Sequence, residues 1–475
     1  MRWIAIFVAV LLACVGTAVA GSGVTSTAAD RKAVAVTVYN DGRGLIREER
    51  LVDLPVGTAE LNFMDVAQKV EAPTVHVAVL EGGAASVLEQ NYEYDLLSPA
   101  KLLEKFVGQT VTLVQRRLKD QSEVEEETPA KLLSTNNGTV WEMGGKIVTN
   151  PSYARLVFPS VPQNLIARPT LVWLVDAALA GKRRIEAAYL TGGMSWKADY
   201  VLALDPSEEK GGLQGWVTID NQSGAAYTDA RLKVVAGDVH RAPAPESPVP
   251  QTLGRTLAFK AAGAPMQEEG LFEYHLYTLQ RPTTLKENQT KQVQLLDAPA
   301  VSVGKDYVLR GNGGYYQGPW ASAPGEKEKV QVFLKFKNSE GAGLGQPLPK
   351  GIVRVYKRDK AGSPQFIGED LIDHTPKDEN VRLEMGNAFD VTAERKQTDY
   401  KRVSAKAHES AFEVRIRNHK DTAVTVRVIE PLGGDWTMVQ SSISFQKAAA
   451  FEAEFAVPVP ADKETVLTYR VRVTY

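Results

Sequence analysis

The sequence predicts a mainly β protein made of several antiparallel β-sandwich domains of the immunoglobulin-like type, with one short helix near residues 98–107. Short runs that alternate apolar and polar residues recur along the chain. Gly, Pro, Asn and Asp separate these runs roughly every 8 to 12 residues, which is typical of sandwiches. One segment alone has helical signals: Ser98 suits an N-cap, Pro99 the first turn and Gly108 the residue after the end.

The expected strands follow in order. Before the helix they are Ala33–Tyr39, Leu45–Val52, Ala59–Phe63, Val75–Leu80 and Ser86–Gln90; after it they are Thr110–Val114, Lys131–Leu133, Thr139–Trp141 and Lys146–Val148. Glu123–Glu127 is expected to be a solvated, charged loop, because it lacks the spaced oxygen ligands and the glycine of a calcium loop. Thr170–Val175 is almost continuously apolar, which indicates a strand buried on both faces. Further strands are Gly215–Asn221, Ala230–Ala236, Val332–Phe336, Gly351–Tyr356, Phe412–Arg417, Val424–Val428 and Leu467–Val473.

The segment Ala188–Tyr200 is the most strongly patterned part of the chain. Gly192 and Gly193 interrupt the alternation, which resumes with Trp196, Ala198 and Tyr200 on one strand face. We expect Trp196 to be structural, packed in a core beside Trp216 or Trp173. The rival interpretation is an exposed indole that stacks on a ligand, because a Gly-Gly bulge can turn an aromatic side chain outward.

Residues 1–20 are predicted to be a signal peptide. Arg2 provides the positive charge, an uncharged apolar run follows, and Ala18–Ala20 fits a cleavage site before Gly21. A permanent membrane anchor is the weaker alternative, because the apolar run is shorter than about 20 residues. A lipoprotein signal with acylation on Cys14 is the other alternative. Cys14 is the only cysteine, so the mature chain is expected to have no disulfide.

The balance of charge excludes some partners. The formal net charge is −2, from 55 basic and 57 acidic residues that are interspersed along the chain. Nucleic acid is therefore not an expected partner, because binding it requires a basic patch. No apolar run after residue 20 has membrane-spanning length, so no transmembrane segment is expected in the mature chain. The sequence does not predict an oligomeric state.

Composition suggests domain boundaries. After a flexible lead at 21–31, we expect a β-rich N-terminal part at 32–160 that contains the helix, and a central sandwich at 161–241. Four prolines in residues 242–250 indicate an extended connector, and 242–270 is expected to be connector and loop. Residues 271–475 form the expected C-terminal sandwich region.

A short pattern, apolar-x-apolar-x-Asn, occurs four times and ends at Asn40, Asn221, Asn338 and Asn418. Each is interpreted as a strand that ends in an asparagine suited to a left-handed turn.

Residues 188–240 and the C-terminal half resemble the DUF4139 family of uncharacterised secreted bacterial proteins. The motifs that carry this resemblance are Tyr189–Trp196, Ala198–Tyr200, Asn221–Gly224, Tyr227, Val235–Val239, Val428–Trp436, Val457–Pro460 and Tyr469–Arg472. The resemblance implies a β-sandwich-rich envelope protein and brings no activity. The motif residues interpreted as structural are Trp196, Asp199, Tyr200, Asn221, Gly237, Asp238 and Trp436.

The sequence contains no catalytic signature. No pair of its six histidines has metal-ligand spacing, and neither a nucleophile elbow nor a phosphate-binding loop occurs, so we predict no metal and no cofactor. A glycine-rich segment contains the aromatic residues Tyr315, Tyr316 and Trp320, which are a candidate platform for binding a sugar or a peptide. The simpler interpretation is that this segment is an ordinary loop whose aromatic side chains pack on the sandwich.

Two classes of function remain. The favoured one is an exported, periplasmic or extracellular envelope protein without catalytic activity, which binds protein or glycan through sandwich loops or sheet edges. The alternative is a hydrolase that acts on an envelope substrate with carboxylates gathered between domains, from Asp199, Asp238, Glu430 and Asp435.

Overall fold

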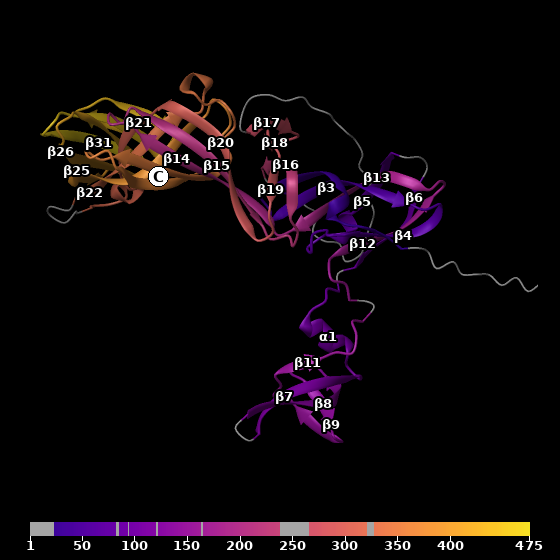
Figure 1. The fold of residues 1–475 in the computed structure, drawn as a ribbon. Helices are drawn as coiled ribbons and strands as arrows, with labels where there is room; N and C mark the ends of the chain where they lie inside the picture. The colour runs from indigo at the N-terminus through magenta and orange to yellow at the C-terminus, as the bar shows by residue number, and fades with distance from the viewer. Residues whose placement is uncertain are drawn as a thin grey trace, which may run out of the picture.

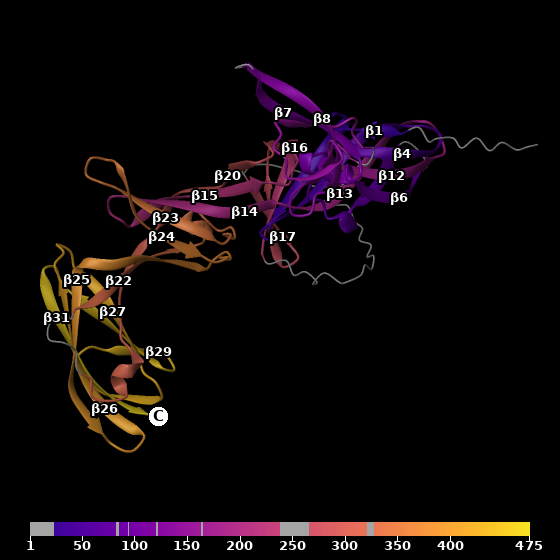
Figure 2. The ribbon, with the colours of Figure 1, turned by 90° about the horizontal axis from the view of Figure 1, so that it is seen from below.

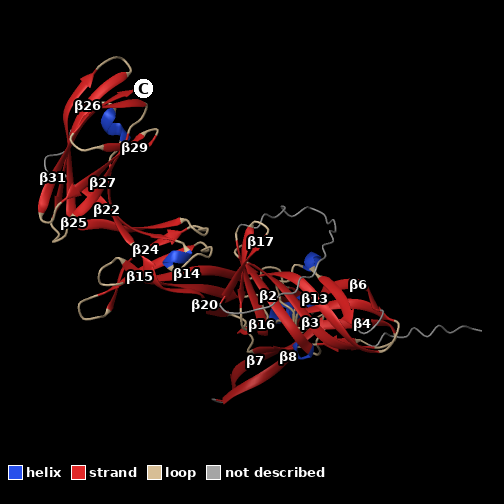
Figure 3. Cartoon of the chain, turned by 90° about the horizontal axis from the view of Figure 1, so that it is seen from above, coloured by secondary structure: helices blue, strands red, loops and turns tan. Residues whose placement is uncertain are grey.

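The computed structural model describes residues 23–81, 85–93, 95–119, 122–162, 165–237, 266–320 and 327–475. The expected mainly β fold is confirmed: strands dominate, and the described residues contain a single α-helix, α1 (Pro99–Lys105) (Figure 3). The strands form five separate sheets, in which most neighbouring strands are antiparallel. The immunoglobulin-like character stays a prediction, as do the domain boundaries.

Sheets 1 and 2 face each other in the N-terminal half. Sheet 1 has the order β1 (Val24–Ser26), β4 (Gly57–Met64), β12 (Thr170–Ala177), β6 (Ala85–Glu93). Sheet 2 has the order β17 (Met266–Leu271), β18 (Tyr274–Leu279), β16 (Tyr227–Ala236), β2 (Arg31–Tyr39), β3 (Arg43–Leu54), β13 (Gly181–Gly192), β5 (His76–Glu81), and β19 (Thr283–Leu285) pairs with β16. One core lies between them, and the guanidinium of Arg50 in sheet 2 stacks 3.6 Å over the ring of Phe63 in sheet 1.

The apolar run at Thr170–Val175 forms most of β12, which lies between β4 and β6 and is largely buried, as expected. Sheet 3 is an excursion between β6 and β12 that extends away from the other sheets together with α1 (Figure 1). Its order is β10 (Lys146–Thr149), β9 (Val140–Met143), β8 (Ser122–Ser134), β7 (Thr110–Lys119), β11 (Arg155–Val157).

The prediction of a charged loop at Glu123–Glu127 is wrong, because these residues belong to β8. They face the basic residues of β7 across the hairpin. Arg117 lies 2.9 Å from Glu126, and Glu125 is 2.7 Å from Arg155 on the other side. Like charges that repel one another along one strand are compatible with a sheet when the neighbouring strand carries the opposite charge.

Sheet 4 lies between the N-terminal sheets and sheet 5 (Figures 1 and 2). Sheet 4 has the order β20 (Gln289–Ser302), β15 (Lys210–Asn221), β14 (Met194–Leu204), β23 (Gly351–Arg358), β24 (Pro364–Ile372). Sheet 5 has the order β28 (Asp435–Ser441), β31 (Lys463–Thr474), β26 (Ala407–Asn418), β25 (Asn380–Arg402), β22 (Glu328–Lys337), β21 (Gly304–Arg310), β27 (Val424–Pro431), β30 (Glu452–Val459), β29 (Phe445–Ala449). Its strands enclose a second core.

The chain passes repeatedly between sheets 2 and 4. The strongly patterned segment is one such passage, since β13 belongs to sheet 2 and β14 to sheet 4. Gly193 joins them with φ 76°, and a Cβ atom there would lie 2.5 Å from the carbonyl oxygen of Gln222. Only glycine fits this combination of a left-handed backbone and a close approach. Sheet 2 therefore takes strands from residues 31 to 279, across several of the segments expected from the sequence.

Candidate functional site

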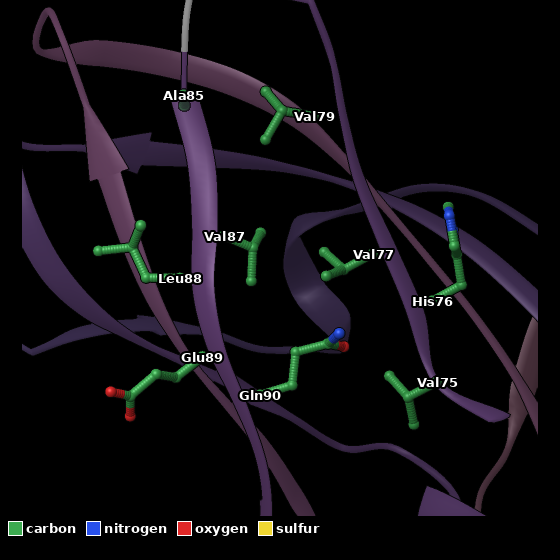
Figure 4. A pocket seen from close by; sticks show the side chains of 9 residues that line it. All are labelled: Val75, His76, Val77, Val79, Ala85, Val87, Leu88, Glu89 and Gln90. Carbon is green, nitrogen blue, oxygen red and sulfur yellow. The ribbon is translucent and has the colours of Figure 1, made fainter. Parts of the chain in front are cut away.

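A groove opens between the last strands of sheets 1 and 2. β5 is the edge of sheet 2 and β6 is the edge of sheet 1. Figure 4 shows the groove between them, with the valine side chains of both strands directed into it. Its volume is about 480 Å³, and its lining residues are Val75, His76, Val77, Val79, Ala85, Val87, Leu88, Glu89 and Gln90.

The register of the two edge strands explains why this groove is apolar. Val77 lies opposite Ala187 and Val79 opposite Ile185, and both partners are fully buried core residues of β13. Val87 lies opposite Val175 of β12 in the same way. Residues paired across strands share one face of a sheet. These valines therefore continue the core of sheets 1 and 2 outward to the surface.

The backbone at the groove is open on one side. In the part of the chain that the structure describes, β5 pairs only with β13 and β6 only with β12. Each edge strand has one bulge, at Leu80 in β5 and at Leu88 in β6. The two bulged leucines are 44% and 54% exposed. Edge strands leave a row of N–H and C=O groups free to pair with another chain, and bulges and charges limit such pairing.

Sheet 1 has a single sign of charge. Its four strands contain four charged residues, all acidic: Glu60, Asp176, Glu89 and Glu93. None of the four has an ion-pair partner among the described residues, although Asn62 donates to Glu60 at 3.2 Å and Thr58 to Asp176 at 3.4 Å. Glu60 and Glu89 flank Leu174 on the face turned away from the core. The groove therefore has an apolar floor and an acidic rim along β6.

The motif residues of β14 lie in another part of the molecule. Trp196 is 6% exposed, belongs to the core shared by sheets 1, 2 and 4, and donates its indole N–H to the carbonyl oxygen of Val235 at 3.1 Å. Trp216 lies opposite Asp199 and thus on the other face of sheet 4, so it does not pack beside Trp196. Tyr200 is buried and donates its hydroxyl to the carbonyl oxygen of Pro349 at 2.7 Å.

Asp199 is held by two donors. Thr218 Oγ1 donates to one carboxylate oxygen at 2.9 Å, and Arg354 Nη1 donates to the other at 3.0 Å. A shallow pocket beside it is lined by side chains that include Trp196, Lys350 and His374. With both of its oxygens already accepting hydrogen bonds within sheet 4, Asp199 has the environment of a structural carboxylate.

The buried asparagines behave differently from the expectation. Asn221, Asn338 and Asn418 are buried, and none has a positive φ, so the prediction of left-handed turns is wrong for them. Their side chains instead bind backbone groups of the loop that follows and of a segment distant in the sequence. Asn418 Nδ2 donates to the carbonyl oxygens of Thr422 (2.8 Å), Val459 (3.2 Å) and Pro460 (3.1 Å), and its Oδ1 accepts from the amide of Lys420 at 3.0 Å. Asn40, the fourth member of the pattern, is exposed.

The side-chain amides of Asn221 and Asn338 bind backbone carbonyl groups in the same way. Asn221 donates to the carbonyl oxygens of Ala225 and Lys286 at 2.9 and 3.0 Å. Asn338 donates to those of Gln346 and Pro376 at 2.8 and 2.9 Å. Among the other motif residues, Gly237 has φ 124° and packs against Tyr274, while Asp238 lies outside the described residues.

The aromatic cluster packs on sheet 5. Tyr316 is fully buried and donates its hydroxyl to Glu430 Oε2 at 2.7 Å, whereas Tyr315 and Trp320 are half-buried with rings 4.4 Å apart. All three rings contact Phe412. Burial raises the pKa of Tyr316 well above its ordinary value. Tyr316 therefore presents no surface to a ligand, and only the partly exposed faces of Tyr315 and Trp320 are left for one.

Asp238 lies outside the described residues, and the other three carboxylates of the hydrolase alternative are not gathered in one place. Glu430 is buried in sheet 5 and paired with Arg395, whereas Asp199 is paired with Arg354 in sheet 4. Asp435 is an exposed residue of β28. Trp436, its neighbour, is buried and donates its indole N–H to the carbonyl oxygen of Ala450 at 3.0 Å.

No cluster of three or more metal-ligating side chains occurs within the described ranges. None of the described helices has the length and apolarity that a membrane crossing requires.

The fold and the groove define a mainly β, multi-sheet protein with an open sheet edge. Residues 185–475 match the model of the family described as "Domain of unknown function (DUF4139)". This match covers more than half of the chain, which therefore belongs to the DUF4139 family, as its motifs indicated. A search of curated proteins finds no match. The two edge strands of the groove, β5 and β6, precede the matched range.

Proposed function

We propose that this is an exported envelope protein that acts as a non-catalytic binding module, and that it holds an extended segment of another protein in the groove between β5 and β6. The observation that carries the proposal is the open apolar groove between β5 and β6, each of which is paired with one strand only among the described residues. Such edges accept peptide segments by main-chain pairing, while adjacent pockets select side chains.

Export is supported by the sequence of residues 1–20, which lie outside the described residues. A location in the envelope is what the resemblance of the motifs implies. Protein is favoured over glycan because the groove is lined mainly by valine and leucine side chains, and not by exposed aromatic rings that stack on sugars.

Site-specific photocrosslinking tests the proposal. A photoreactive amino acid at Leu88, an exposed leucine of the groove, should capture a protein partner when the chain is expressed in its own cells. The control is the same group at Leu118, an even more exposed leucine in β7 of sheet 3. The proposal requires adducts that are specific to position 88 and that map to one extended segment of the partner.

Two results would contradict it. The same set of adducts from positions 88 and 118 would mean that the groove selects nothing. An adduct at position 88 that glycan digestion removes would assign the groove to a glycan instead.

A further inference from the structure

The strand order and the charges of sheet 1 carry an inference about the partner, which rests on the proposed function. We infer that the groove accepts an added strand along β6, and that this strand alternates aliphatic residues with lysine or arginine. The bound segment thereby becomes the fifth strand of sheet 1.

β6 is the better of the two edges for pairing. After its bulge at Leu88, the run Glu89–Glu93 pairs with β12 without any further irregularity, which gives five residues of regular edge. β5 has only four regular residues, His76–Val79, before its bulge at Leu80. Since strands are commonly five to six residues long, β6 presents an edge of ordinary strand length.

The two faces of the edge demand different side chains. Ala85, Val87 and Gln90 lie on the core face of β6, where their partners in β12 are Ala177, Val175 and Trp173. An added strand would place every second side chain on this face, above the valines of the groove. Aliphatic side chains at these positions would cover the open margin of the core, because burying apolar surface is favourable.

The opposite face of β6 carries Glu89 and Glu93, four residues apart and about 13 Å from one another in a strand. Both are exposed, and neither has an ion-pair partner among the described residues. Residues directly opposite in neighbouring strands interact, and like charges there are unfavourable. Because sheet 1 holds no basic residue in any of its strands, its field selects lysine or arginine at the outward positions of the added strand.

Peptides of defined sequence test this inference. The probes are a fluorescent nine-residue peptide of alternating valine and lysine, a valine–glutamate counterpart, and the valine–lysine peptide N-methylated at every second residue. Anisotropy titrations with the purified protein should show binding of the first peptide alone. N-methylation removes the amide donors of one edge, so it should weaken binding at least tenfold if the backbone is paired.

Matched variants locate the site. Glu89→Lys combined with Glu93→Lys should weaken the valine–lysine peptide at least tenfold, since both changes reverse the charge that the peptide meets. Glu123→Lys is the control, because Glu123 is an equally exposed carboxylate in sheet 3 without an ion-pair partner among the described residues. All three substituted glutamates are exposed, and thermal melts should confirm that the variants remain folded.

The outcomes separate this inference from the proposed function. Equal binding of the valine–glutamate peptide, or no effect of N-methylation, would overturn the inference while Leu88-specific adducts still supported the groove. If sedimentation showed a dimer that the β6 variants dissociate, the edge would hold a second copy of this chain, and the inference would be wrong. Failure of both the peptides and the crosslinking would remove the proposed function as well.

Discussion

Asn418 offers a direct measure of how much the buried asparagines stabilise the fold. Asn418 ends β26; its Nδ2 shares two hydrogens among three nearby carbonyl oxygens, and its Oδ1 accepts a hydrogen bond from one backbone amide. Each such hydrogen bond contributes about 1 kcal/mol net, and buried groups that lose their partner are costlier. Water can reach part of the site, because the groups at Thr422 and Pro460 are only part-buried. Asn418→Ala should therefore destabilise the C-terminal part by roughly 2 to 4 kcal/mol.

Scanning calorimetry is the suitable assay, because a chain with more than one core need not unfold in a single transition. For a unit of this size, the expected loss lowers the midpoint of one transition by roughly 5 to 15 °C and leaves the transition of the other core in place. The control is Asn40→Ala, since Asn40 ends the same sequence pattern but is exposed. Its change should stay within about 0.5 kcal/mol. Equal shifts of the transition midpoint for the two variants would refute the conclusion that the hydrogen bonds of Asn418 stabilise the fold.

Further outcomes follow from burial, backbone and charge. Trp196→Ala should lower the free energy of unfolding by roughly 3 to 5 kcal/mol, and an unchanged melting midpoint would contradict the interpretation of Trp196 as a core residue. Phe272 is 89% exposed with φ 59°, so Phe272→Gly should leave the melting midpoint unchanged or higher; a clear decrease would show that its ring stabilises the fold. The intact mass of the protein purified from its own cells should be that of a chain that begins at Gly21 and carries no lipid, whereas a diacylglyceryl group on Cys14 would establish the lipoprotein alternative. Burial raises the pKa of nine tyrosines in the described chain, and the six of them that are buried are Tyr189, Tyr200, Tyr227, Tyr277, Tyr316 and Tyr469. Each of these tyrosines holds its proton more tightly in the folded chain than in the unfolded chain. Its contribution to the free energy of unfolding is therefore complete below the ordinary pKa of 10.0. Above that pH the contribution declines by about 1.4 kcal/mol per pH unit for each tyrosine. Tyrosinate absorbance should therefore rise together with unfolding, and ionisation of these residues in a chain that remains folded would contradict the assignment.

The sequence predicted those features that depend on local patterns. Alternation identified most strands, because each side of a strand faces one environment and leaves a period of two in the sequence. The helix was also predictable, since Ser98 accepts a hydrogen bond from the amide of Lys101 at 3.2 Å as an N-cap does. The asparagine pattern was found, but its role was not. Whether an asparagine turns the backbone or binds distant carbonyl groups depends on burial, and Val459 is 41 residues away from Asn418.

The groove could not be predicted from the sequence, for a related reason. Val77 and Val87 look like any inward residues of an alternating strand. What makes them a site is that β5 and β6 end their sheets, and this depends on pairing between segments as distant as β6 and β12. The uniform negative charge of sheet 1 has the same origin, because Glu60, Asp176 and Glu89 come from three separate segments. Likewise, Glu123–Glu127 is compatible with a strand because Arg116 and Arg117 of the neighbouring strand lie opposite Glu125 and Val124.

The way in which sheet 3 leaves the main body has one more consequence. The chain departs after β6 and returns before β12, and the two points of passage are joined by a bridge between Leu96 and Ile166, where the amide of Leu97 donates to the carbonyl oxygen of Ile166 at 2.9 Å. α1 and sheet 3 have a small core of their own, formed around Trp141 and Phe106. They are thus an inserted module whose ends meet, the arrangement in which one domain is tolerated inside another. Deleting this module and closing the gap with a short linker should leave β6 paired with β12, so the open edge of sheet 1 and the inserted module are structurally independent parts of one chain.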